Sequence, residues 1–404
     1  MESNLKIAIN AASAKMGGAV TYLSNLLRHL PSAGSGFQFF VFLPSETAKG
    51  LLDIPASIKI CPLPAKMVGG WRRLWWEQIT LRRFLVREKV DASFSTANFA
   101  MLRCPVKQIL LVRNALYFSK LYQQIFLPRH RLRMRIAFRL RRWMICRSIK
   151  SADIVVTPTR AMLDELRAYV DVPEAKALVC PYGVDPPNAQ PSQPEREEAM
   201  RPRAVVRLLY VSLYSDHKNL NTLLKAIPIL NNGGPGRFLL NTTVSPAWEG
   251  AAWTATHGED MKLSQQPGIS PWVRFLGPLP KEQMEHLYRG SDIFVFPSLT
   301  ESFGFPMAEA MSYGLPIVAS DTPVNREICG EAAIYFNPLN AEDLARQIRL
   351  LARDATLREH LSAKGQERAR TQFRWDTHVG PILDMANRVS PKASEEFEPE
   401  RCFK

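Results

Sequence analysis

The 404-residue chain lacks several features that would place it in a special class of proteins. No run of about 18 uninterrupted apolar residues occurs, so a membrane-spanning helix is not predicted. The six cysteines form no C-x-x-C pair and the seven histidines show no metal-ligand spacing, which excludes a disulfide framework and predicts no bound metal. The opening Met1 to Asn4 lacks the basic start and apolar core of a signal peptide. We therefore expect a cytoplasmic protein.

Acidic residues are scarce in the first half of the chain. Residues 1–185 contain 28 Lys or Arg against 12 Asp or Glu, so the net charge of +14 originates there. The stretch from Arg129 to Lys150 contains eight arginines, one lysine and no acid. Its apolar residues recur at helical spacing beside the arginines, which predicts a basic amphipathic helix with a stripe formed by Leu132, Ile136, Leu140 and Trp143.

Three interpretations of this helix are open. Its apolar stripe could pack against the core, leaving a solvated charged face. Alternatively, each basic residue contributes about 1 kcal/mol of attraction near an anionic membrane surface, which predicts peripheral membrane contact through residues 129–150. Clustered arginines also suit nucleic acid, but no zinc-finger spacing or RNA-recognition motif occurs, so no nucleic-acid partner is expected.

Short, continuous apolar stretches alternate with helical patterns along the whole chain. Such stretches are typical of strands buried on both faces of a parallel sheet, with helices as crossovers. The predicted strands lie at 6–9, 39–43, 109–112, 153–156, 207–211, 273–276, 292–296 and 315–319. The fold class is therefore α/β, with two Rossmann-like domains whose sheets face a central cleft.

The composition also predicts the domain boundaries. A proline-rich and then charged stretch at 186–203 reads as a linker between the N-terminal domain, 1–185, and the C-terminal domain, 204–373. We expect a helix at about 374–390 to complete the N-terminal domain. Residues 391–404 read as a frayed tail.

The stretch from Asp292 to Ala310 carries the most informative pattern. A strand ends at Pro297, Gly304 permits a tight turn, and a helix is expected to begin near Phe305 or Pro306. The N–H groups at such a helix start bind phosphate, and carboxylates accept hydrogen bonds from sugar hydroxyls. Glu301 and Glu309 are therefore candidates for holding a sugar or ribose, although Glu309 could instead be an ordinary acid in a first helical turn.

This stretch resembles the E-x7-E signature of glycosyltransferase family 4, a retaining family with the GT-B fold. Glu301-(x7)-Glu309 carries an S-F-G-F-P insert, and the following A-x-x-G-x-P-type pattern ends at Ser320. Further segments follow the family order over nearly all of the chain: Lys15–Gly18, Ser151–Pro158, Pro181–Asp185, Lys218-Asn219, Phe275–Gly277 and Phe373–Trp375.

The resemblance implies a role for each matching residue. Glu301 would contact donor-sugar hydroxyls, and Glu309 the ribose of the nucleotide. Lys218 would meet the diphosphate, together with backbone groups near Phe303, Gly304 and Phe305. Further candidates at the donor are Gly17, Gly18, Ser212 and His217; the glycine loop lies beside the donor phosphates or the acceptor in the family.

Two positions depart from the family pattern. Leu213 stands where many relatives have an arginine that accompanies the lysine on the diphosphate. Arg113-Asn114 stands where relatives commonly have His-Asp. Asn114 could exchange hydrogen bonds near the reacting centre, and Arg113 could hold a diphosphate or an acidic acceptor.

Taken together, the residues and the resemblance predict a retaining, hexosyltransferase-type enzyme. It would use a nucleotide-diphosphate sugar and a glycan or lipid-linked acceptor, in cell-surface polysaccharide biosynthesis such as that of lipopolysaccharide. No Asp-x-Asp triplet occurs, so we expect no metal and no other cofactor. The expected location is cytoplasmic, with peripheral contact at the inner membrane face. A catalytically inactive nucleotide-sugar-binding scaffold and a sugar-nucleotide epimerase are the alternatives.

Overall fold

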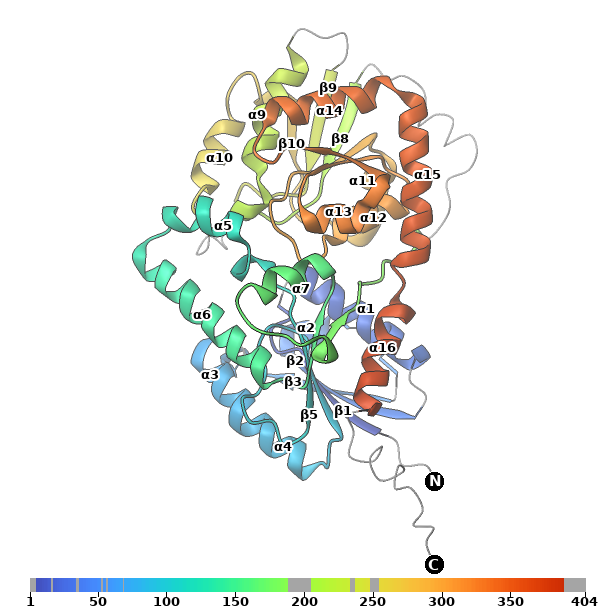
Figure 1. The fold of residues 1–404 in the computed structure, drawn as a ribbon. Coiled ribbons are helices and arrows are strands. Elements are labelled where there is room, and N and C mark those ends of the chain that lie inside the picture. Colours follow the sequence, from blue (N-terminus) through green and yellow to red (C-terminus); the bar gives the residue numbers. More distant parts are fainter. Residues whose placement is uncertain are drawn as a thin grey trace, which may run out of the picture. The chain divides into compact units, whose positions relative to one another are not determined.

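The computed structural model describes most of the chain, and its described residues form two compact units (Figure 1). Unit 1 consists of residues 1–118, 139–183 and 375–404, and unit 2 of residues 119–138 and 184–374. The described ranges are 5–15, 17–33, 36–51, 54–55, 57–67, 69–187, 205–232, 237–247 and 254–388. Nearly all of the predicted linker and the whole predicted tail lie outside them.

Unit 1 is built on a seven-stranded parallel sheet of order β3-β2-β1-β4-β5-β6-β7. Its strands are β1 (Leu5–Asn10), β2 (Phe37–Pro44), β3 (Ile58–Leu63), β4 (Ala92–Ser95), β5 (Lys107–Leu111), β6 (Ile154–Thr157) and β7 (Ala177–Val179). Its helices are α1 (Gly18–Ala33), α2 (Ser45–Lys49), α3 (Gly70–Trp75), α4 (Arg82–Arg87), most of α6 (Leu132–Ser151), α7 (Arg160–Arg167) and α16 (Trp375–Arg388).

Unit 2 is built on a six-stranded parallel sheet of order β10-β9-β8-β11-β12-β13. Its strands are β8 (Val205–Tyr210), β9 (Arg237–Thr242), β10 (Val273–Phe275), β11 (Ile293–Phe296), β12 (Ile317–Ser320) and β13 (Ala333–Phe336). Its helices are α5 (Lys120–Ile125), α9 (Leu220–Asn231), α10 (His257–Ser264), α11 (Lys281–Arg289), α12 (Phe305–Ser312), α13 (Pro323–Cys329), α14 (Ala341–Arg353) and α15 (Ala355–Gln372).

The predicted α/β class with two Rossmann-like sheets is confirmed. Each of the eight predicted strands lies in one of the sheets, with ends that differ by at most two residues. Strands β4, β11 and β12 are buried along their whole length, and every side chain of β11 is inaccessible to solvent. Continuous apolar runs arise because helices cover both faces of each sheet.

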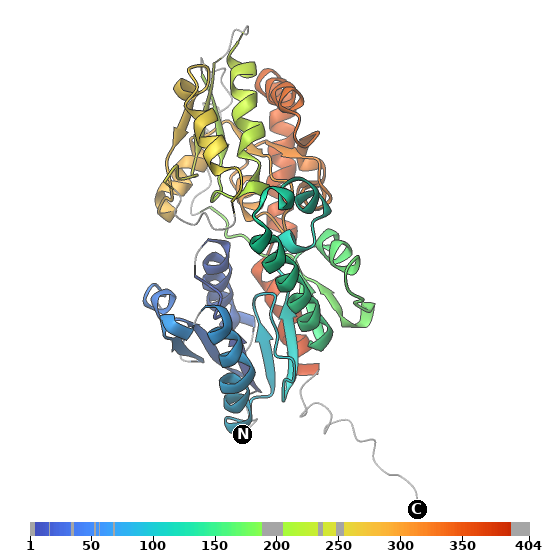
Figure 2. The same cartoon turned by 90° about the vertical axis from the view of Figure 1, so that its left-hand side faces the viewer.

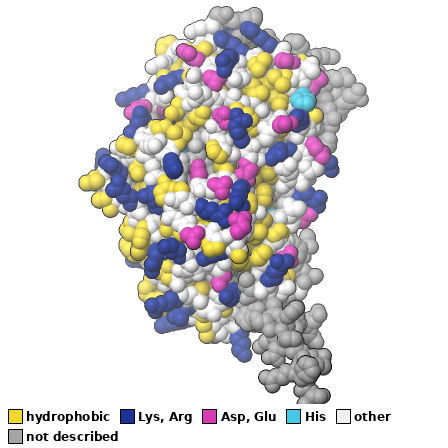
Figure 3. Space-filling view, viewed as in Figure 1, with side chains coloured by type: hydrophobic (Ala, Val, Ile, Leu, Met, Phe, Trp, Pro, Cys, Tyr) yellow, Lys and Arg dark blue, Asp and Glu magenta, His cyan; other side chains and the backbone are white. Residues whose placement is uncertain are grey.

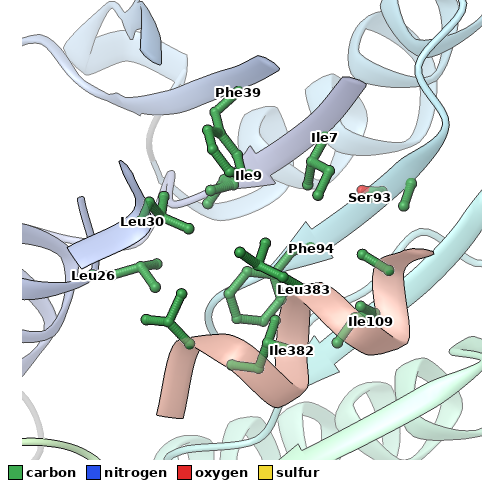
Figure 4. Close-up of a pocket in the computed structure, with 13 residues that line it drawn as sticks. Ile7, Ile9, Leu26, Leu30, Phe39, Ser93, Phe94, Ile109, Ile382 and Leu383 are labelled. Atoms are coloured by element: carbon green, nitrogen blue, oxygen red, sulfur yellow. The ribbon is translucent and has the colours of Figure 1, made fainter. Parts of the chain in front are cut away.

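Helix α16 completes the core of unit 1, far in sequence from the strands it covers. Figure 4 shows Ile382 and Leu383 of α16 directed toward Ile7 and Ile9 of β1, around a small apolar cavity. Phe94 of β4 lines the same cavity, as does α1. This burial of apolar side chains stabilises the docking of the last helix on the sheet.

The predicted basic helix exists as α6, but its apolar stripe faces solvent. Leu132, Ile136, Leu140 and Trp143 are 68%, 57%, 44% and 60% exposed. The alternative in which this stripe packs against the core is therefore wrong: α6 packs through another face, which includes Phe138, Ile145 and Ile149. Figures 1 and 2 show α6 as a long helix at the surface, and Figure 3 shows basic and apolar side chains gathered at the edge where Figure 1 places it.

No described helix combines the length and the apolar composition needed to cross a bilayer.

Candidate functional site

The candidate donor site lies where the chain order of the unit 2 sheet reverses. From β8 the chain passes to β9 on one side, and it later returns to the other side of β8 as β11. Ligands of open parallel sheets bind at the carboxyl ends of the strands beside such a reversal. Lys218 follows β8 and Glu301 follows β11, and Lys218 Nζ lies 2.5 Å from Glu301 Oε1. The structure thus brings together Lys218 and Glu301, two of the three residues on which the donor-site prediction depends; Glu309 is the third.

The loop that carries Lys218 is fixed through its backbone. The Leu299 N–H donates to the carbonyl of His217 over 2.8 Å, which joins the loops after β8 and β11. The Tyr210 hydroxyl donates to the Lys218 carbonyl over 2.9 Å. Asn219 adopts a left-handed conformation, φ 56°, and its side-chain amide donates to the carbonyl of Pro297. These contacts hold the start of the Lys218 side chain in one place.

Helix α12 begins at Phe305, as predicted, directly after a left-handed glycine. Gly304 has φ 84°, and a Cβ there would lie 2.5 Å from the terminal carbon of Met307. Any larger residue would therefore strain the turn and crowd the helix. Phe303 is buried, and its ring contacts those of Phe305 and Phe373. This packing sets the direction in which the helix start, with its positive dipole end, leaves the loop.

Glu309 lies in the second turn of α12 and has a specific partner. The first turn of the helix contains no acid, so the reading of Glu309 as a first-turn acid is wrong. The Tyr288 hydroxyl donates to Glu309 Oε2 over 2.7 Å. Burial raises the pKa of Glu309, and the hydrogen bond from Tyr288 opposes that rise. Burying this carboxylate costs solvation free energy. Proteins accept such a cost more often at binding sites than at contacts that only stabilise the fold.

We expect Glu309→Gln to stabilise the protein and to weaken donor binding. Because the folded-state pKa is raised, the stability contributed by the carboxyl is lost as pH rises through that pKa, and a neutral amide avoids the loss. The melting temperature should rise at pH 7.5, while donor affinity falls about tenfold with the loss of a charged hydrogen bond. Thermal melting and calorimetric titration measure the two effects.

The exposed acid Glu282 on α11 provides the control, since Glu282→Gln should change neither quantity. The gain in melting temperature should shrink toward acidic pH, where the wild-type carboxyl takes up its proton. A Glu309→Gln protein that melts below wild type at pH 7.5 would contradict the argument.

The other predicted residues of unit 2 have mainly local roles. His217 Nδ1 lies 2.8 Å from the hydroxyl of Ser215. The pKa of His217 lies well below its ordinary value, because burial and then the charge of Lys218 disfavour the imidazolium. The Ser212 hydroxyl donates to the carbonyl of Leu213, and Leu213 itself is 36% exposed. A neutral His217 can donate or accept a hydrogen bond but adds no positive charge.

The remaining predicted residues belong to unit 1. Gly17, with φ 57°, and Gly18 lie between β1 and α1, beside the point where the order of that sheet reverses between β1 and β4. The Arg113 guanidinium lies over the ring of Tyr22, 5.4 Å from its centre. The side-chain oxygen of Asn114 accepts the N–H of Leu116, so it caps a short turn.

The sequence analysis did not single out several residues that the structure places around Lys218 and Glu309. Tyr288 holds Glu309, and Asp216 is a fully buried carboxylate two residues before Lys218. His130 and Tyr122 belong to a segment of the first half of the chain that packs in unit 2. Of these residues, only Asp216 could have been noticed in the sequence, because it is an acid beside the Lys218-Asn219 pair. Tyr288, His130 and Tyr122 lie in distant segments.

Among the described residues, no three His, Cys, Asp or Glu side chains lie close enough together to hold a metal ion.

Comparison with known proteins supports the family resemblance. The family model "Glycosyl transferases group 1" matches residues 194–368, and the model "Glycosyltransferase Family 4" matches residues 16–187. The chain is 31% identical over 169 residues to the O-antigen chain mannosyltransferase B of Escherichia coli, which covers 42% of each protein. The matched region therefore spans less than half the length of that curated relative.

Two solved structures show the same fold at low identity. Sucrose-phosphate synthase from Thermosynechococcus elongatus aligns with TM-score 0.74 and 17% identity, over 96% of this chain and 99% of that chain. Anabaena HepE, solved in complex with UDP-glucose, aligns with TM-score 0.69 and 16% identity, over 96% and 100% of the two chains. These alignments establish the fold.

Proposed function

Since the chain belongs to glycosyltransferase family 4, we propose that it transfers a sugar from a nucleotide-diphosphate sugar to a glycan or lipid-linked acceptor. The relative that builds O-antigen chains supports a place in cell-surface polysaccharide biosynthesis, and the UDP-glucose complex of HepE supports the donor class. The observation that carries the proposal is the contact between Lys218 and Glu301 at the sheet reversal of unit 2.

The chemistry of the donor explains why these two side chains must be neighbours. In a nucleotide sugar the diphosphate and the sugar ring meet at the anomeric carbon. A cation for the departing phosphate and an acceptor for ring hydroxyls therefore have to lie close together, as Lys218 and Glu301 do. In this proposal Glu309 accepts hydrogen bonds from the ribose, and the start of α12 faces the diphosphate.

The positive charge that stabilises the departing diphosphate comes, in this proposal, from Lys218 and the N–H groups near Gly304 without a metal. The acceptor hydroxyl attacks from the face that the diphosphate leaves, and its proton passes to the diphosphate, so the anomeric configuration is retained. Arg113 and the glycine loop of Gly17 and Gly18 serve the acceptor or the diphosphate from unit 1. Asn114 contributes hydrogen bonds near the reacting centre.

A donor screen tests the proposal directly. The full chain is melted in the presence of uridine, guanosine and thymidine diphosphate sugars, because a bound ligand raises the melting temperature by mass action. The donor that stabilises it is then offered with lipid-linked and free glycan acceptors, with and without a metal chelator. The proposal requires one donor to bind and its sugar to be transferred; no stabilisation by any of them would exclude it.

We also propose that the enzyme works at the inner membrane face, with α6 resting on anionic lipid. The exposed apolar stripe of α6 lies among basic side chains, a combination suited to the headgroup region. Replacing both Leu140 and Trp143 with serine should reduce sedimentation with anionic vesicles at least about tenfold, because burial of each side chain contributes about 1.5–3 kcal/mol. High salt should weaken binding of the wild type.

Leu350 on α14 is a matched control for this measurement. It is 45% exposed, against 44% for Leu140, so Leu350→Ser removes a comparable apolar surface from another helix. That variant should bind vesicles like the wild type. Equal sedimentation with neutral and anionic vesicles would contradict the membrane proposal.

A catalytically inactive donor-binding scaffold is the second candidate. It is favoured by Leu213, which places an exposed apolar side chain where many relatives have a diphosphate-binding arginine. Binding of a nucleotide sugar without transfer or hydrolysis across a broad acceptor panel would support this candidate.

A further inference from the structure

A segment from the first half of the chain packs in unit 2 and contacts the loop of Lys218. We call residues 119–138 the strap; it contains α5 and the first turns of α6, and it is drawn in teal in Figure 1. In sequence the strap interrupts unit 1, between Phe118 and Arg139. Within unit 2, two strap residues contact the loop that carries Lys218.

The first contact is between His130 of the strap and Asp216. His130 Nε2 lies 3.3 Å from Asp216 Oδ2, and the two side chains are 6% and 0% exposed. The Nε2 atom of the strap histidine thus faces the buried carboxylate of Asp216. Nε2 also lies 3.1 Å from the hydroxyl of Tyr122, so one strap residue supports the other.

Asp216 also joins the strap to the segment just before α10. Its carboxylate accepts the N–H groups of Ala255 and Thr256 and the hydroxyl of Thr256, just before α10. His130 faces the same carboxylate from the strap. Removing one partner of such a group typically costs more than the contact itself contributes, because the charge stays buried.

The second contact is between Tyr122 and His217. Their rings meet edge to face, with centres 6.4 Å apart. Tyr122 is itself fixed by the rings of Phe126 and Phe138, and all three strap side chains are buried. The strap therefore touches the two residues that immediately precede Lys218 in the chain.

We propose that the strap is part of the diphosphate-binding machinery. This inference rests on the donor site proposed above. His130 and Tyr122 are positioning residues: through Asp216 and His217 they hold Lys218 where it meets the diphosphate and Glu301. The cation in the C-terminal half is then placed by residues encoded before α6, the helix that carries the exposed apolar and basic surface.

The test uses His130→Phe in the full chain, which keeps a ring but removes the nitrogen that faces Asp216. We expect kcat to fall about tenfold and the Kd for the nucleoside diphosphate to rise about tenfold, because a buried carboxylate loses one of its polar partners. The Kd for the nucleoside should stay within about twofold, because in the proposal Lys218 meets the diphosphate and not the base. His130→Gln, whose amide can still donate, should recover part of the loss.

A double-mutant cycle with Lys218→Ala separates positioning from general destabilisation. If His130 acts through Lys218, His130→Phe should change kcat little once Lys218 is absent. The exposed His360 on α15 is the control, and His360→Phe should behave like wild type. If His130→Phe folds poorly, Tyr122→Phe, which removes only a hydroxyl, provides a second variant in which the same kcat and Kd values test the strap.

The outcomes distinguish the strap from the site it supports. Equal fold-losses from His130→Phe in the wild-type and Lys218→Ala backgrounds would overturn the positioning role, and so would unchanged diphosphate affinity in both strap variants. Nucleoside diphosphate binding that is insensitive to Lys218→Ala would instead overturn the proposed donor site itself.

Discussion

Replacing Lys218 with alanine is expected to lower kcat for sugar transfer about 100-fold to 1,000-fold. Removal of one preorganised group that stabilises charge in a transition state has effects of that size. Lys218 Nζ is close to Glu301 and lies over the ring of Phe296, in a position only 20% exposed. Water cannot easily replace an ammonium group there. Single-turnover transfer with a saturating donor measures the chemical step without product release.

The controls for this prediction separate charge from folding. Lys225 is exposed on α9, which starts directly after the loop of Lys218, and Lys225→Ala should leave kcat unchanged. Glu301→Gln should reduce transfer less than Lys218→Ala, since the amide oxygen still accepts a hydrogen bond from a sugar hydroxyl. Transfer at the wild-type rate in both the Lys218 and Glu301 variants, with folding intact, would remove these residues from the site.

The sequence predicted the central strands because their environment leaves a simple pattern. Strands such as β11 are buried on both faces, and burial selects an uninterrupted apolar run. The strands that were not predicted are short or mixed in composition. Strand β7 has three residues, and β4 reads Ala-Ser-Phe-Ser, so neither differs clearly from a loop. Their strand character comes from their neighbours in the sheet.

The donor-site residues were identifiable for a different reason. Lys218 and Glu301 lie in the loops after β8 and β11, and Glu309 lies in the helix that follows β11, so local spacing and family order single them out. The residues that hold these side chains in place come from distant parts of the sequence. Tyr288 reaches Glu309 from α11, and His130 reaches Asp216 across 86 positions of the chain. A single sequence gives no sign of such pairs, because either residue alone is ordinary.

The apolar stripe on α6 shows what periodicity leaves open. Apolar residues at helical spacing predict a helix correctly, but periodicity alone does not say what the apolar side meets. In α6 a second apolar face, with Phe138, Ile145 and Ile149, packs inside and leaves Leu132 and Trp143 exposed. Two apolar faces on one helix are compatible with a helix that lies between a protein core and another apolar phase.

Two segments that follow the family order meet at Gly183, and this contact gives the prediction with the largest expected effect on stability. A Cβ at Gly183 would lie 2.4 Å from the backbone nitrogen of Trp375 and 2.5 Å from its ring. Trp375 begins α16 and is 4% exposed, so neither its backbone nor its ring can move aside cheaply. Gly183→Ala should therefore destabilise unit 1 by about 3 kcal/mol or more, as overpacking against backbone does.

Denaturant unfolding measures this loss, and Gly258 on α10 provides the control. Apart from its chain neighbours, a Cβ at Gly258 would meet no atom within 4 Å, so Gly258→Ala should stabilise the protein by about 0.5–1 kcal/mol. The two substitutions add the same methyl group, and their effects should have opposite signs because only Gly183 faces Trp375. Trp375→Ala removes the ring contacts but leaves the backbone nitrogen in place, so Gly183→Ala should have a smaller but still destabilising effect in that background. A Gly183→Ala protein as stable as wild type would mean that Trp375 does not dock against this glycine in solution.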